Sequence, residues 1–165
     1  MARREDITRL YELLDELEQT VGGKQTLKDC TGYMDWPDRG VYFFFASDEH
    51  RDAGDQLRIT RIGTHAVSEG SSTSLWNRLR THRGAKRGTY EGGGNHRGSV
   101  FRKRVGEAFL VRDSLDDEYP HWGEGSSAKR DRRHSELELE RRVSDYIRDL
   151  PFLWLNVDDE PSAES

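Results

Sequence analysis

The chain of 165 residues contains a single cysteine, Cys30, and only 33% of its residues are hydrophobic. One cysteine excludes an intramolecular disulfide and a zinc cluster built from cysteines. No segment is long and apolar enough to cross a membrane, and no apolar run follows the charged start Met-Ala-Arg-Arg-Glu-Asp, so a secretory signal is not expected. These features predict one compact unit with no membrane partner and a cytoplasmic location.

The charge of the chain is distributed unevenly. The formal net charge is −5, yet residues 58–104 contain eleven Arg or Lys and two acids, a net of +9. The remainder contains 15 bases and 29 acids, a net of −14. Such a basic block suits one surface that faces phosphate groups, although a solvated basic loop paired with the acidic flanks explains the composition equally well.

Hydrophobic periodicity predicts alternating helices and strands. An amphipathic helix is expected over 5–20, two paired strands over 40–46 and 57–63, and a short helix from Leu75 to Gly84, capped by Ser72, Thr73 or Ser74. The glycine-rich segment 84–98 is expected to be a mobile basic loop.

The second half of the chain predicts two further helices and a strand. The helices are expected over 99–112 and from Ser135 to Leu150, with an irregular segment over 113–132 between them. Ser135 and Glu138 have the spacing of a capping box. The last strand is expected over 152–157.

Four sequence features occur in a distinctive order. The first strand begins with the motif Gly-Val-Tyr, whose last residue is Tyr42. The second strand contains the motif Arg61-Ile-Gly. The next helix contains Arg78 and His82, which are four residues apart and therefore lie on one face. Glu140 is on the last helix. In this order the motifs resemble the GIY-YIG nuclease superfamily over about 36–156, roughly three quarters of the chain.

The resemblance implies a fold and a division of the chain. The expected fold is α/β, with a central, mostly antiparallel three-stranded sheet flanked by helices and an additional N-terminal helix. Residues 1–36 would form a helical extension, 37–157 the nuclease-like domain and 158–165 a disordered acidic tail.

The resemblance also implies roles for Tyr42 and Arg61. Tyr42 matches the first-motif tyrosine, which helps to activate the attacking water in the family; an ordinary sheet aromatic is the alternative. A phenol needs nearby cations or metal-bound water to act as a base at neutral pH. Arg61 stands where the second-motif tyrosine is usual. It is interpreted as a functional replacement, with an exposed strand residue as the alternative.

The expected helical site residues are Arg78, His82 and Glu140. Arg78 matches the family arginine that stabilises phosphate charge, and His82 would assist proton transfer or bind phosphate. A solvated basic helix is the alternative for both. Glu140 would hold one Mg²⁺ or Mn²⁺; Glu136 and Glu138 compete for this role, and an exposed first-turn acid is the alternative.

Several other side chains are expected to contact nucleic acid. Those in and around the basic block are Arg80, Arg83, Asn95, His96, Arg97 and Arg102. Asn156 is added as an accessory residue that corresponds to a late asparagine of the family. For Asn95, His96 and Arg97, a flexible surface loop is an equally good explanation.

These observations predict a metal-dependent endonuclease that acts on nucleic acid, with DNA as the expected substrate. Water would attack the phosphodiester in line, helped by Tyr42 and one divalent cation. The alternatives are a noncatalytic nucleic-acid-binding module that keeps the fold, and a structural protein whose basic block meets an acidic partner. The sequence leaves the oligomeric state open.

Overall fold

The computed structural model describes residues 2–51, 55–66 and 74–158. The expected caps Ser72 and Thr73 and all but the first residue of the acidic tail lie outside these ranges. Among the described helices, none combines the length and hydropathy that a membrane span requires.

The sheet is antiparallel and has four strands in the order β1-β4-β2-β3. They are β1 (Gln25–Thr26), β2 (Gly40–His50), β3 (Leu57–His65) and β4 (Pro151–Asn156). The expected α/β class is confirmed, but the prediction of three strands was wrong because β1 was missed. Two polar residues have no detectable periodicity, so only the pairing of Gln25 with Phe152 reveals this strand.

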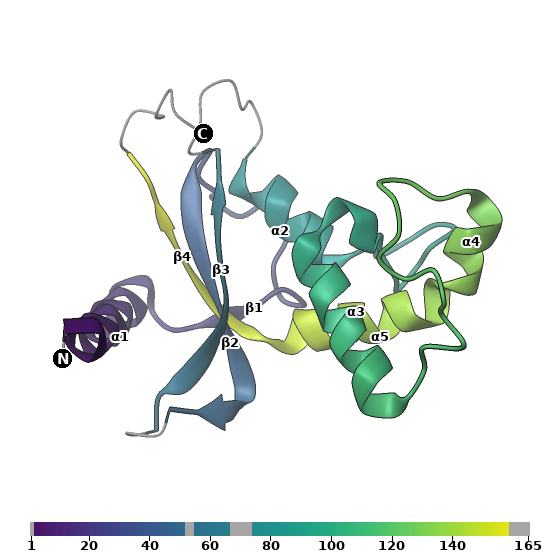
Figure 1. The fold of residues 1–165 in the computed structure, drawn as a ribbon. Helices are drawn as coiled ribbons and strands as arrows, with labels where there is room; N and C mark the ends of the chain where they lie inside the picture. The colour runs from purple at the N-terminus through teal and green to yellow at the C-terminus, as the bar shows by residue number, and fades with distance from the viewer. Residues whose placement is uncertain (1, 52–54, 67–73, 159–165) are drawn as a thin grey trace.

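Both faces of β2 are covered (Figure 1). Tyr42 and Phe44 point into the larger core, formed with the helices α2 (Leu75–Arg83), α3 (Val100–Asp113) and α5 (Leu137–Asp149). Phe43 and Phe45 point into a smaller core with Leu14 of α1 (Ala2–Val21) on the opposite face. Alternation along a strand requires this division, and it explains why β2 is apolar on both sides.

The start of the last helix differs from the prediction. The helix α4 (Arg130–Ser135) ends where the long helix was expected to begin, and α5 starts at Leu137. Ser135 donates its hydroxyl to the Arg132 carbonyl and does not cap α5. The backbone at Glu136 is still helical, so the extended geometry of an N-cap residue is not available there.

The glycine-rich segment is more structured than expected. It contains a short 3₁₀ helix, η1 (His96–Gly98). Its two sides are joined by backbone hydrogen bonds, from Ala85 N to Gly93 O at 2.7 Å and from Gly92 N to Ala85 O at 3.0 Å. Arg141 and Arg148 of α5 donate to the carbonyl oxygens of Glu91 and Ala85, and these bonds hold the segment against α5.

Candidate active site

Tyr42 lies at the centre of the sheet, on β2, between Gly63 of β3 and Trp154 of β4. Its side chain is fully buried. The ring lies across Gly63, where a Cβ atom would be only 2.2 Å from the Tyr42 hydroxyl oxygen. The glycine of the Ile-Gly motif therefore has a steric function, since any other residue would displace the tyrosine.

We expect the substitution Gly63→Ala to destabilise the protein by about 1–3 kcal/mol, because the added methyl group must displace the Tyr42 ring within a packed core. Urea unfolding measures this effect. Gly98→Ala is the matched control, since its added Cβ would meet nothing closer than Thr81 at 3.7 Å. Equal stabilities of the two variants would contradict the steric function of Gly63.

The Tyr42 hydroxyl is hydrogen-bonded to His82 Nε2 at 2.8 Å, and His82 Nδ1 is bonded to the Ser99 hydroxyl at 2.8 Å. His82 is on α2 and is fully buried. Ser99 caps α3, where its hydroxyl accepts the Arg102 backbone N–H. Three side chains from β2, α2 and the start of α3 thus form one buried chain of hydrogen bonds.

His82 is neutral at physiological pH. Burial, together with the charges of Arg78 and Arg61, lowers the pKa of His82 to about 3. A neutral imidazole has one donor and one acceptor nitrogen. With the proton on Nδ1, His82 donates to Ser99, and Nε2 is then free to accept the Tyr42 hydroxyl proton.

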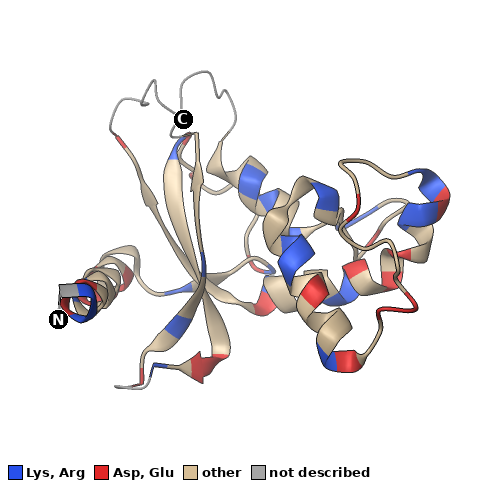
Figure 2. Cartoon of the chain, in the orientation of Figure 1, with Lys and Arg blue, Asp and Glu red and all other residues tan. Residues whose placement is uncertain are grey.

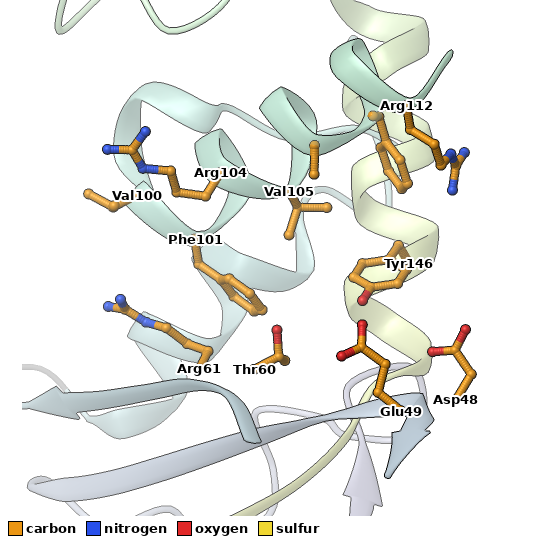
Figure 3. A pocket seen from close by; sticks show the side chains of 12 residues that line it. Asp48, Glu49, Thr60, Arg61, Val100, Phe101, Arg104, Val105, Arg112 and Tyr146 are labelled. Carbon is orange, nitrogen blue, oxygen red and sulfur yellow. The ribbon is translucent and has the colours of Figure 1, made fainter. Parts of the chain in front are cut away.

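Arg61 lines a pocket of about 490 Å³ between β3 and α3. Figure 3 shows Arg61 and Thr60 rising from β3 below Phe101, with Tyr146 of α5 on the far wall. Phe101 also contacts His82 edge to face, at 5.6 Å between ring centroids. Within the described ranges, Arg61 Nε is buried without a hydrogen-bond partner, and the Arg61 charge is close enough to His82 to affect its pKa.

Glu140 is buried as expected of an inward-facing carboxylate, but its surroundings do not fit a metal ion. One oxygen accepts the backbone N–H of His96 at 2.6 Å and its ring Nδ1 at 3.0 Å. The other accepts Nε and Nη2 of Arg102. Four donors occupy the four lone-pair sites of the carboxylate, so a cation has no position left.

The charge of Glu140 is compensated within the protein. Burial alone would raise the pKa of Glu140, but the hydrogen bonds from His96 and Arg102 and the Arg102 charge lower it. In the described part of the chain, no group of three or more His, Cys, Asp or Glu residues could hold a metal ion. The expectation that Glu140 holds Mg²⁺ or Mn²⁺ therefore does not agree with this geometry.

Three residues expected to contact nucleic acid are occupied inside the protein. Arg102 is fully buried, where it contacts Glu140 and donates to the His82 carbonyl at 2.7 Å. His96 is buried and stacked on Trp122. The Arg97 guanidinium donates to both carboxylate oxygens of Glu136, at 2.6 and 2.8 Å. These side chains hold η1, α3 and α5 together and are not on the exposed surface where they were expected.

The other residues expected to contact nucleic acid do not take part in these buried contacts of η1, α3 and α5 in the same way. Arg80 is exposed on α2, and Asn95 caps η1 through the Arg97 backbone N–H. Arg83 is nearly buried and donates to the Cys30 carbonyl. Asn156 is exposed at the end of β4, where it bonds to Asp158. Asn156 does not join the buried hydrogen bonds around Tyr42.

Sequence reasoning missed Ser99 and Phe101 as parts of the site. Both residues were included only as members of the helix expected over 99–112. The available signal was the position of Ser99 immediately before an amphipathic segment, which is typical of an N-cap. Its bond to His82, 17 residues earlier in the chain, could not be read from that pattern.

No curated protein and no solved structure gives a significant match to the chain. A family model described as a GIY-YIG domain matches residues 1–165, which is the whole chain. The chain therefore belongs to the GIY-YIG domain family.

Proposed function

We propose that this protein is an endonuclease that hydrolyses phosphodiester bonds in nucleic acid, with DNA as the expected substrate. Its family implies a nuclease-type function and binding of nucleic acid. The observation that carries the proposal is the Tyr42–His82 hydrogen bond, with the charges of Arg61 and Arg78 close enough to lower the pKa of His82. A proton-transfer pair beside two cations supplies a base and charge stabilisation, both of which accelerate phosphodiester hydrolysis.

The two arginines have two roles in the proposed mechanism. They bind the phosphate and stabilise the charge that develops on its oxygens. The bound phosphate also offsets the two positive charges that lower the pKa of His82. Substrate binding therefore makes His82 more basic at the moment when a proton must be accepted.

Proton transfer then follows the hydrogen bonds. Tyr42 passes its proton to His82 Nε2 and takes one from the attacking water, and the resulting hydroxide attacks phosphorus in line with the leaving oxygen. The bond from phosphorus to the leaving oxygen breaks as the new bond forms, and the leaving oxygen takes up a proton from solvent. Ser99 accepts from Nδ1 and fixes the orientation of the ring. Because Tyr42 is fully buried, water reaches its hydroxyl only when binding displaces the surrounding side chains.

Metal dependence is a separate question in this proposal. The resemblance implied Mg²⁺ or Mn²⁺ on Glu140, but the carboxylate is saturated by donors from His96 and Arg102. No step of the proposed mechanism is therefore assigned to a metal. Each assay is made with Mg²⁺, with Mn²⁺ and with a chelator.

We expect purified protein to cleave nucleic acid and the Tyr42→Phe variant to be at least about 100-fold slower, because it lacks the proton-transferring hydroxyl. Supercoiled plasmid, linear duplex, single-stranded DNA and RNA are offered in parallel, and products are resolved on gels. Tyr33→Phe is the matched control, because the Tyr33 side chain is fully exposed. Equal rates for wild type and Tyr42→Phe would refute the mechanism.

A second candidate is a noncatalytic nucleic-acid-binding module. The saturated hydrogen bonding of Glu140 favours it, since this carboxylate is where the resemblance places the metal. This candidate predicts binding that persists in chelator and no cleavage of any of the four substrates with either metal ion. The assay above distinguishes the two functions.

A further inference from the structure

A second pocket, of about 410 Å³, lies beside α2. Four cations line it together with Tyr90 and Asn95; they are Arg80, Arg83, Lys86 and Arg133. We call these six residues the α2–α4 basic pocket. None of the described residues that line the pocket is Asp or Glu, and Figure 2 shows Lys and Arg on both α2 and α4. The pocket is therefore positive without an internal counter-charge.

Two of the cations are held in place by aromatic rings. The Arg83 guanidinium lies 4.7 Å from the Trp76 ring centroid and donates to the Cys30 carbonyl. The Arg133 guanidinium lies 3.7 Å from the Tyr90 ring centroid and donates to the Gly94 carbonyl. Held arginines lose little conformational entropy when they bind an anion, so the pocket is preorganised.

The positive charges of the α2–α4 basic pocket are not paired with carboxylates in the described part of the chain. Among the residues that the structure describes, none of the four cations forms an ion pair with a carboxylate, and Arg83 Nε is buried without a hydrogen-bond partner. Burial and the charges of Arg148 and Arg80 lower the pKa of Arg83. An anion in the pocket would relieve this repulsion between positive charges.

The pocket and the candidate active site lie on different faces of α2. Arg78 and His82 share the face that meets Tyr42, and Arg80 and Arg83 are turned away from it by the helical repeat. A helix is only about 10–12 Å across with its side chains. A strand of nucleic acid that crosses α2 can therefore contact both places.

We propose that the α2–α4 basic pocket binds a backbone phosphate of the nucleic acid next to the phosphodiester at Tyr42. The identity of the ligand rests on the proposed function. The pocket then binds the nucleic acid and fixes its position on the protein, and the Tyr42 site hydrolyses the phosphodiester. Arg80, Arg83 and Asn95 contact the nucleic acid here, together with Lys86, Tyr90 and Arg133.

The test measures binding of a fluorescently labelled 20-base-pair duplex by anisotropy, in chelator and over a range of salt concentrations. We expect the double variant Lys86→Gln/Arg133→Gln to bind about tenfold more weakly, and the slope of log K against log salt to become shallower by about 1. Lys28→Gln/Arg58→Gln is the control, since it removes the same charge from exposed residues outside the pocket. Thermal unfolding verifies that both variants are folded.

The outcomes separate this inference from the proposed function. Pocket-dependent binding supports the inference even when no substrate is cleaved. Equal weakening of both double variants means that net charge alone matters and overturns it, as does a wild type that does not bind. Inorganic pyrophosphate is titrated in parallel; saturation at micromolar concentration indicates a site for a free phosphate compound and also overturns the inference.

Discussion

Replacing Arg102 with alanine is expected to lower the free energy of unfolding by roughly 3–5 kcal/mol, because the change leaves the Glu140 carboxylate buried without its main counter-charge. Both side chains are almost completely inaccessible. Arg102 also donates to the carbonyl oxygens of His82 and Glu140 and to the Ser144 hydroxyl. The substitution removes donors from all of these groups at once.

Urea unfolding measures the effect, with Arg104→Ala as the matched control. Arg104 is on the same helix, but its side chain is 71% exposed and pairs with Glu107 at the surface, so its loss is expected to cost less than about 1 kcal/mol. The double variant Arg102→Met/Glu140→Leu is expected to lose less stability than the sum of the two single variants. If the stability loss of the double variant equals the sum of the losses of the single variants, the two charges do not stabilise each other.

Stability is also expected to fall as the pH decreases from about 6.5 towards 3, and His82 is one cause. The unfolded chain binds a proton on this residue near its ordinary pKa of 6.5, whereas in the folded protein the pKa is lowered to about 3. Between these values the unfolded state binds more protons than the folded state, so acid favours unfolding. The contribution of His82 is at most about 1.4 kcal/mol per pH unit.

A comparison with His82→Gln isolates this contribution. Glu140 and Asp113 also have lowered pKa values and cause loss of stability in acid, but they are present in both proteins. The stability advantage of wild type over the variant is therefore expected to shrink as the pH falls from 7 to 4, measured by urea unfolding at each pH. A constant difference would mean that His82 does not titrate on unfolding. His121→Gln, at an exposed histidine, serves as the control.

Much of the fold could be predicted because its elements have strong local patterns. The strand β2 is apolar on both faces because it lies between two cores, and α5 has a continuous buried stripe. The two-residue strand β1 has no such pattern. The cap predicted at Ser135 failed because a preceding helix, α4, already occupies that residue. Tertiary arrangement decided these details, and local sequence did not contain them.

The candidate site could be predicted only in part, for a similar reason. Arg78 and His82 are one helical turn apart, so their common face follows from spacing alone. Glu140 contacts Arg102 and His96 across 38 and 44 residues of sequence. Arg102 belongs to the run Arg102-Lys103-Arg104, which is typical of an exposed basic surface, yet its helix face points inward. Contacts between residues that are far apart in the sequence cannot be predicted from a local sequence pattern.

Ser99 couples two properties of the molecule that are usually treated separately. Its single hydroxyl accepts a backbone N–H in the first turn of α3 and is also hydrogen-bonded to the His82 ring. Fraying of that turn would remove the Ser99 hydrogen bond from the His82 ring, so the stability of the helix start contributes to the alignment of the Tyr42–His82 pair. Local opening of α3 and the order of the Tyr42–His82 pair are therefore energetically coupled.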